Sequence, residues 1–220
     1  TLGIQIKKWI FSHSLQHQLF CYNTVMKLCI FSGTFNPIHK AHLKMAEYVL
    51  SHYGFDKIVF IPAYKPPHKD YAPEMCQHRY NMVKLATKHN SHFDVSDIEF
   101  QSEGKSYSYL TVLKLYEQFK IDGKINFIIG TDAFEKIETW YEADKLKKIV
   151  DFIVFVRENE TVNLDYLKEK GYNFEFTQMP FVDISSTELR EKISKGLTIN
   201  NLVTKEVEEY IYKNGLYKYS

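Results

Sequence analysis

Six short apolar runs alternate along the chain with longer segments of mixed polarity. Several runs are apolar throughout instead of alternating with polar residues, which is the pattern of strands covered on both faces. The runs predict strands at 27–31, 57–61, 93–97, 125–129, 151–156 and 173–179.

The segments between the runs place their apolar residues at helical spacing. They predict helices at about 40–52, 74–90, 107–119, 142–149, 162–170, 186–195 and 204–213. Gly171, Gly196 and Gly215 follow such segments, where the end of a helix favours glycine. The alternation of strand and helix predicts an α/β fold with a Rossmann-like, doubly wound parallel sheet and right-handed crossovers.

This rhythm begins at Met26 and is not interrupted by a Gly/Ser linker, a repeat or a low-complexity tract. We therefore expect a single domain over residues 26–220. Residues 1–25 precede the first strand and are expected to be an N-terminal extension, whose origin and role the sequence leaves open.

Composition and charge argue against several classes of protein. The formal net charge of +1 provides no general attraction to nucleic acid or to an anionic membrane surface. The three cysteines are widely spaced and fit neither a disulfide framework nor a structural zinc site, so a reducing, cytoplasmic location is expected. No run approaches the roughly 18 apolar residues of a membrane span. The oligomeric state stays open, and a homo-oligomer is compatible with the sequence.

The stretch SGTFNPIHKAH follows the first strand, at the carboxyl edge of the expected sheet. Ligands of doubly wound sheets bind beyond this edge. Gly33 permits a tight turn or a close approach to a ligand, and Asn36-Pro37 fits an N-cap followed by proline at the first helical position. His39 and His42 would share a face of the helix start, where the helix dipole favours an anion.

The two histidines also have a simpler explanation. The chain contains nine histidines, and His89 and His92 have the same spacing, so the pattern by itself is weak evidence of a site. Zinc is less favoured still, because no third ligand falls at metal-binding spacing. The position of the pair beside Gly33 is what favours a functional role.

Three further stretches follow strands of the expected sheet. Prolines 62, 66, 67 and 73 argue against a helix in the loop that carries His68 and Lys69. Gly130-Thr131-Asp132 ends the fourth strand, and Trp140-Tyr141 come shortly after it. Arg79 is read either as a helper at the ligand or as a surface charge.

Two helix starts carry hydroxyl groups. Ser106 fits an N-cap, before a helix whose expected apolar face includes Leu110, Leu113 and Phe119. Ser185 and Glu188 fit a capping box, with Arg190 close to the same end of the helix.

Together and in this order, these stretches resemble the motifs of the nucleotidyltransferase superfamily. GTFNPIHKAH resembles the signature G-T-F-[DN]-P-x-H-x-G-H and ISSTELR resembles I-S-S-T-x-x-R, while PPHK and the GTD and WY segments resemble nicotinate-nucleotide adenylyltransferases. The resemblance covers about residues 26 to 217. Asn36 stands where Asp is commoner, and Ala41 stands where the signature has glycine, adding a methyl group near the expected nucleotide.

The resemblance implies a nucleotidyltransferase type of Rossmann-like fold and a set of site residues. It assigns catalysis to His42, His39, Lys69 and Arg190. It assigns ATP binding to Gly33, Thr34, Phe35, His39, His42, Gly130, Asp132, Ile184, Ser185, Ser186 and Arg190. It assigns nicotinate mononucleotide to His68, Lys69, Ser106, Tyr107, Ser108, Trp140 and Tyr141. It also implies Mg²⁺ as the cofactor, held mainly by the ATP phosphates, without direct protein ligands.

The implied reaction is adenylyl transfer from ATP to nicotinate mononucleotide, which yields nicotinate adenine dinucleotide and pyrophosphate in NAD biosynthesis. A phosphate monoester is largely deprotonated at neutral pH, so its attack on ATP needs no side-chain base. Two alternatives stay open: another small-molecule adenylyltransferase, such as that for phosphopantetheine, and a non-catalytic nucleotide-binding module, which Ala41 leaves in play. The preference between nicotinate and nicotinamide mononucleotide also stays open.

Overall fold

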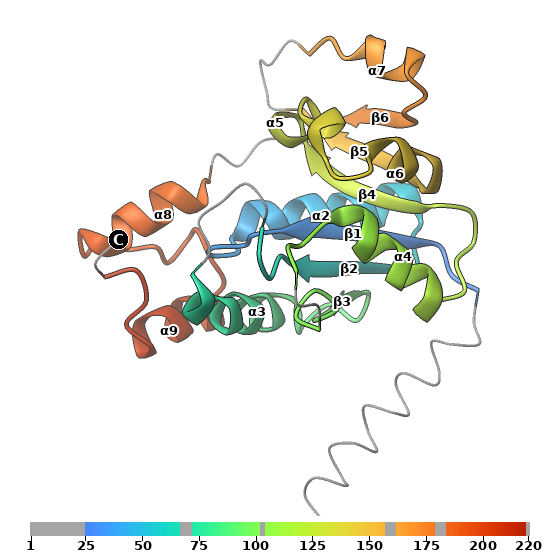
Figure 1. Ribbon diagram of the computed structural model, residues 1–220. Coiled ribbons are helices and arrows are strands. Elements are labelled where there is room, and N and C mark those ends of the chain that lie inside the picture. Colours follow the sequence, from blue (N-terminus) through green and yellow to red (C-terminus); the bar gives the residue numbers. More distant parts are fainter. Residues whose placement is uncertain (1–24, 67–71, 102–103, 157–161, 179–183, 219–220) are drawn as a thin grey trace, which may run out of the picture.

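The computed structural model describes residues 25–66, 72–101, 104–156, 162–178 and 184–218. Six strands form one parallel sheet in the order β3-β2-β1-β4-β5-β6 (Figure 1). Their bounds are β1 Leu28–Gly33, β2 Lys57–Pro62, β3 Phe93–Val95, β4 Ile125–Gly130, β5 Val150–Phe155 and β6 Phe174–Thr177. The order reverses between β1 and β4, so the predicted doubly wound sheet is confirmed.

Helices connect the strands, and two more, α8 and α9, follow the last strand. Their bounds are α2 Lys40–Tyr53, α3 Pro73–Thr87, α4 Ser108–Gln118, α5 Thr131–Phe134, the 3₁₀ turn η1 Ile137–Thr139, α6 Ala143–Ile149, α7 Asp165–Glu169, α8 Ser186–Ser194 and α9 Lys205–Lys213. Gly171, Gly196 and Gly215 follow α7, α8 and α9 with φ of 86°, 68° and 62°, as the sequence predicted. Within the described residues, no helix is long and apolar enough to cross a membrane.

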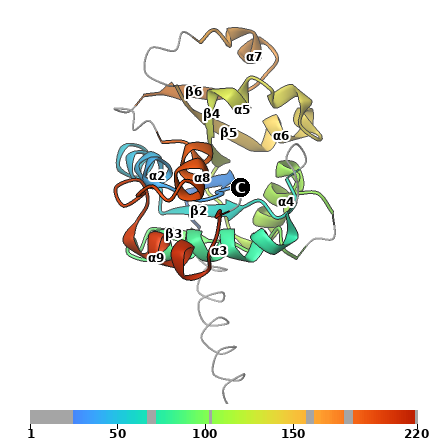
Figure 2. The ribbon, with the colours of Figure 1, turned by 90° about the vertical axis from the view of Figure 1, so that its left-hand side faces the viewer.

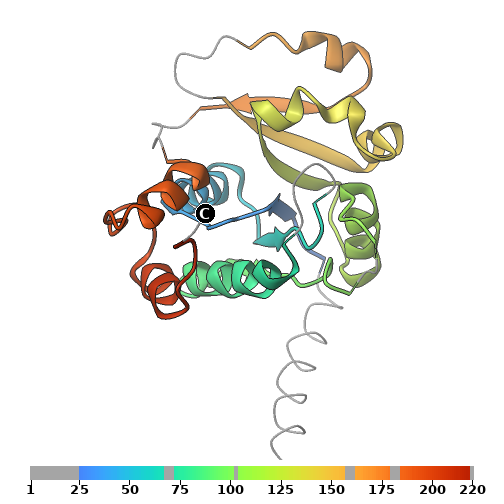
Figure 3. The ribbon, with the colours of Figure 1, turned by 60° about the vertical axis from the view of Figure 1, so that its left-hand side comes forward.

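The sheet separates two apolar cores. Cys29 and Phe31 of β1 pack toward α2, α3, α8 and α9, whereas Leu28 and Ile30 pack toward α4, α6 and α7. Figure 3 shows these two groups of helices on opposite sides of the sheet. Burial on both faces explains why β1 is apolar without alternation.

The helix α4 differs from its prediction in its start and in its buried face. Its N-cap is Tyr107, not Ser106. Leu110 and Leu113 are 42% and 37% exposed, and the residues that face the core are Thr111, Val112 and Leu115. The expected apolar face was wrong for these two leucines, because Thr111, with a hydrogen-bond partner in the interior, occupies a core-facing position; Phe119 packs against the core as predicted.

Other differences lie at element ends. Asn36 is not an N-cap, because α2 begins at Lys40 with His39 as its N-cap, and the Asn36–Pro37 peptide bond is cis. Pro73 does not exclude a helix, since it occupies the first position of α3, where proline has no hydrogen bond to lose. The short elements α5 and η1 were not predicted, and α7 is shorter than the helix expected at 162–170.

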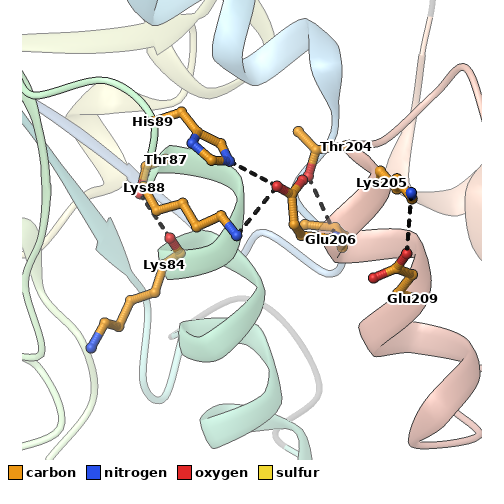
Figure 4. A network of polar contacts seen from close by, with 9 residues as sticks. Lys84, Thr87, Lys88, His89, Thr204, Lys205, Glu206 and Glu209 are labelled. Carbon is orange, nitrogen blue, oxygen red and sulfur yellow. Dashed lines mark hydrogen bonds and ion pairs between the residues drawn. The ribbon is translucent and has the colours of Figure 1, made fainter.

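The C-terminal helix α9 is held against α3 by polar contacts (Figure 4). Glu206 accepts hydrogen bonds from His89 at 2.8 Å and pairs with Lys88 at 3.3 Å. The pKa of Glu206 is lowered to about 2, chiefly by the hydrogen bond from His89. The hydroxyl of Tyr210 also bonds the side chains of His78 and Asn81, each at 2.9 Å. These contacts fix the C-terminal segment on the same side of the sheet as α2.

Candidate active site

A cleft lies where β1 and β4 separate at their carboxyl ends. Their ladder comprises the pairs Cys29–Asn126 and Ile30–Phe127, so the last residues of the two strands are not paired with each other. Beyond them lies a cleft of about 820 Å³ at the carboxyl edge of the sheet, the edge that Figure 2 faces. Every residue predicted for ATP lines this cleft: Gly33, Thr34, Phe35, His39, His42, Gly130, Asp132, Ile184, Ser185, Ser186 and Arg190.

The imidazoles of His39 and His42 stack at the start of α2. Their ring centroids are 3.6 Å apart, and the planes differ by 28°. Nδ1 of His42 accepts a hydrogen bond from the backbone N–H of His39 at 3.2 Å. A neutral imidazole that accepts at Nδ1 carries its proton on Nε2, so His42 presents an N–H donor from that atom.

His39 is the more buried of the two histidines. It is 6% exposed, and this burial lowers its pKa to about 4, so the ring is neutral at pH 7. Its Nδ1 has no hydrogen-bond partner among the described residues. Buried nitrogen atoms are seldom left unpaired in native proteins. Such an atom in a ring that lines a cleft is consistent with a site that a ligand completes.

Packing restricts the residues on the floor of the cleft. Phe35 is buried with φ of 47°, a backbone conformation uncommon for a bulky residue. Its ring contacts His42 edge-on at 5.1 Å. A Cβ atom on Gly33 would lie 3.1 Å from this ring, so Phe35 would have to shift by a few tenths of an ångström. Glycine is therefore favoured here by side-chain packing, since no positive φ is involved.

The start of α8 is hydrogen-bonded to the loop that follows β1. Ser185 and Glu188 form the predicted capping box. The hydroxyl of Ser186 donates to the carbonyl oxygen of Pro37 at 2.9 Å. Arg190 donates from Nη1 to the carbonyl oxygen of Asn36 at 2.8 Å. The N-termini of α2 and α8 are thus joined, and both ends present N–H donors and a positive dipole to one cavity.

A second cleft of about 520 Å³ adjoins the first, and Gly33, Thr34 and Ala133 line both. It contains the described residues predicted for nicotinate mononucleotide, which are Ser106, Tyr107, Ser108, Trp140 and Tyr141. The rings of Tyr107 and Tyr141 lie 4.6 Å apart at one wall. Trp140 contacts Phe127 of the core edge-on and also lines the cleft.

Ser106, just before α4, is hydrogen-bonded to the loop that follows β2. Its N–H donates to the carbonyl oxygen of Lys65 at 2.9 Å, and its hydroxyl accepts from the N–H of Lys65 at 3.0 Å. This serine therefore ties the start of α4 to the loop after β2 instead of capping the helix. His68 and Lys69, in the same loop, lie outside the described residues, so their assignments stay predictions.

Glu99 lines the second cleft and was missed by the sequence reading. It is 5% exposed, accepts from the N–H of Tyr64 at 3.2 Å and from the hydroxyl of Thr111 at 2.9 Å. Burial raises its pKa, although these hydrogen bonds act in the opposite direction. Lys136 and Thr139 also line the cleft without having been predicted. All three belong to polar stretches that look like ordinary surface in the sequence.

Arg79 is neither a surface charge nor part of the lining of either cleft. It is 4% exposed, and its guanidinium donates to the carbonyl oxygens of Thr34 at 2.8 Å, Ala63 at 2.6 Å and Tyr64 at 3.2 Å. It thus joins the loops that follow β1 and β2. The buried charge is compensated because several carbonyl dipoles accept from it.

Comparison with known proteins agrees with this architecture. The Cytidylyltransferase-like family model matches residues 30–192. A "Probable nicotinate-nucleotide adenylyltransferase" of Caldicellulosiruptor saccharolyticus is 38% identical over 198 residues, which are 88% of this chain and 100% of the relative. A protein of the same name from Dictyoglomus thermophilum is 40% identical over 196 residues, covering 87% and 100%. This chain belongs to the nicotinate-nucleotide adenylyltransferase family.

Solved structures of other proteins share the fold of this chain. The Plasmodium falciparum nicotinic acid mononucleotide adenylyltransferase complexed with NaAD superposes with a TM-score of 0.71 at 23% identity, covering 88% of this chain and 98% of that chain. The same protein complexed with APC gives a TM-score of 0.69 at 21% identity, covering 89% and 98%.

Proposed function

We propose that this nicotinate-nucleotide adenylyltransferase family member transfers the adenylyl group of ATP to nicotinate mononucleotide, releasing pyrophosphate and forming nicotinate adenine dinucleotide for NAD biosynthesis. The observation that carries the proposal is the pair of adjoining clefts. One is lined by imidazoles and helix N-termini, which suit a triphosphate, and the other by aromatic rings, which suit a pyridine nucleotide. Residues 26–220 would act as one domain.

The reaction joins two phosphates and requires little proton transfer. An oxygen of the mononucleotide phosphate attacks the α-phosphorus of ATP, and the bond from that phosphorus to the bridging oxygen of pyrophosphate breaks. The attacking phosphate has a second pKa of about 6 and is already largely deprotonated at pH 7. The protein then contributes position and compensation of negative charge, which dominate catalysis of phosphoryl transfer.

Each predicted catalytic residue has a proposed contact. His42 donates from Nε2 to the transferred phosphate, and His39, stacked on His42, also contacts the phosphates. Ser186 and Arg190 bind the leaving pyrophosphate. Two N–H groups of Arg190 contact Asn36 and Thr187, and a guanidinium has five. Lys69, with His68, reaches the phosphates from the loop after β2.

The mononucleotide is proposed to lie with its pyridine ring on Trp140. The backbone N–H of Tyr141 donates to the nicotinate carboxylate, while Ser106, Tyr107 and Ser108 line the opposite part of the cleft. The phosphate of the mononucleotide then points to residues that line both clefts, among them Gly33 and Thr34, and so toward ATP.

The residues present fit Mg²⁺ carried mainly by the substrate. Asp132 lines the ATP cleft, where its carboxylate would contact the ribose or organise the ion without ligating it directly. The described residues contain no group of three or more His, Cys, Asp or Glu side chains arranged for a metal. When bound with ATP, the ion would offset negative charge on the departing phosphates.

A substrate panel tests the proposal. The protein is incubated with ATP and Mg²⁺ and with nicotinate mononucleotide, nicotinamide mononucleotide or phosphopantetheine, while pyrophosphate is followed. We expect release with nicotinate mononucleotide. No release with any acceptor would refute an adenylyltransferase, and release with phosphopantetheine alone would refute the proposed acceptor.

His42→Ala tests the assignment of the catalytic donor. Loss of one donor to the transition state lowers kcat on the order of 10²–10³-fold. The matched control is His52→Ala, an exposed histidine in the last turn of the same helix, which should keep full activity. Circular dichroism should be the same for all three proteins. Retention of more than about a tenth of the wild-type rate by His42→Ala would contradict the assigned role.

A further inference from the structure

Asn36 is held at both its backbone and its side chain by the C-terminal part of the chain. Its carbonyl oxygen accepts from Arg190, 154 positions away in sequence, at 2.8 Å. Its side-chain Oδ1 accepts from the hydroxyl of Tyr217, 181 positions away, at 2.7 Å. Asn36 lines the ATP cleft, whereas Tyr217 lines neither cleft.

The direction of the second bond decides which end of the amide a ligand meets. Arg190 and Arg79 act electrostatically on Tyr217 and lower the pKa of its hydroxyl, against the larger rise caused by burial. A tyrosine hydroxyl can donate or accept, and here it donates its proton to Oδ1 of Asn36. With Oδ1 occupied in this way, the donors that the Asn36 amide can offer come from Nδ2.

We propose that Tyr217 is a positioning residue for ATP: its hydroxyl orients the Asn36 amide so that Nδ2, and not Oδ1, is presented to the triphosphate. An amide turned the other way would place a carbonyl oxygen against phosphate oxygens, which repel it. The inference rests on the proposed function, because it assigns the triphosphate to this cleft. The proposal also means that the segment after α9 contributes to ATP binding, although that segment follows the last residue matched by the family model.

The test is Tyr217→Phe in the full chain, which keeps the ring and removes the hydroxyl. Binding of α,β-methylene-ATP with Mg²⁺ is measured by calorimetry, and KM for each substrate is measured by pyrophosphate release. We expect the affinity for the ATP analogue to fall about tenfold and KM for ATP to rise by a similar factor, as for loss of one orienting hydrogen bond. KM for nicotinate mononucleotide should change less than about twofold, because only the ATP contact is altered.

A double-mutant cycle and a matched control separate orientation from general weakening. Asn36→Ala should also lower ATP affinity, and adding Tyr217→Phe to it should have no further effect. Tyr210→Phe removes hydroxyl contacts between α9 and α3 and should lower stability without changing ATP affinity. Independent losses in the double variant, or a Tyr217→Phe protein with ATP affinity within twofold of wild type, would overturn the proposal.

The same experiment distinguishes this inference from the proposed function. A wild-type protein that binds the ATP analogue but turns over no nicotinate mononucleotide would refute the function, while the binding data on Tyr217→Phe would still decide the inference. A wild-type protein with no measurable affinity for the ATP analogue would overturn both.

Discussion

Protonation of His39 should destabilise the folded protein in mild acid. Its pKa is lowered from 6.5 to about 4 by burial, so the unfolded chain binds a proton more readily than the folded one. Where the unfolded state binds more protons, stability rises with pH. The contribution of His39 is therefore fully present above about pH 6.5 and is lost as pH falls toward 4.

The size of the effect follows from the two pKa values. At pH 5 the difference in proton binding costs about 2 kcal/mol relative to neutral pH, and the limit below pH 4 is about 3 kcal/mol. Domains are typically stable by about 5–15 kcal/mol, so a loss of this size is measurable by urea unfolding. Desolvation of the charged imidazolium is the physical cause, because His39 is 6% exposed.

The variant His39→Gln removes the titrating group, and His52→Gln is the matched control from the exposed side of the same helix. Free energies of unfolding are compared at pH 7.5 and pH 5. The His39→Gln protein should lose about 2 kcal/mol less than wild type on acidification, whereas His52→Gln should follow wild type closely. The absolute stability of the His39→Gln protein does not matter, because only the change in its free energy of unfolding between the two pH values is compared. An equal acid loss in His39→Gln and wild type would refute a buried, neutral His39.

Three further outcomes are expected. Glu99 is a buried carboxyl whose pKa is raised, so its ionisation destabilises the folded protein as pH rises. Glu99→Gln keeps the shape of the side chain and should lose less free energy of unfolding than wild type when pH rises from 5 to 8. Equal losses would contradict this. Trp140→Leu should raise KM for nicotinate mononucleotide roughly tenfold while KM for ATP stays constant, and an unchanged value would remove the stacking role. Glu206→Gln should lower the free energy of unfolding by less than about 1 kcal/mol at pH 7, because the ion pairs of Glu206 are at the surface. Since the pKa of this carboxyl is lowered, its contribution is lost as pH falls from about 4.5 toward 2. A larger cost, or one that does not depend on salt, would contradict this.

The sequence alone determined the order of the strands and of the longer helices, and the class of fold. Strands such as β1 and β5 are read correctly because burial on both faces demands continuous apolar residues, a signal that is local. The cap of α8 is likewise local, since Ser185 and Glu188 lie within one turn. Motifs at the ends of strands could be placed at one edge, because all strands of a parallel sheet point the same way.

Only the tertiary structure decided what the polar side chains touch. Arg79 and Glu99 are charged residues that the sequence places on a helix and in a loop, yet both are buried and compensated by partners from other segments. Nothing near Tyr217 in the sequence points to Asn36, although the two are joined at 2.7 Å. Periodicity reports which face of an element is buried, whereas the partner of a buried polar group is set by how distant segments pack, and that information is not local to any stretch of the chain.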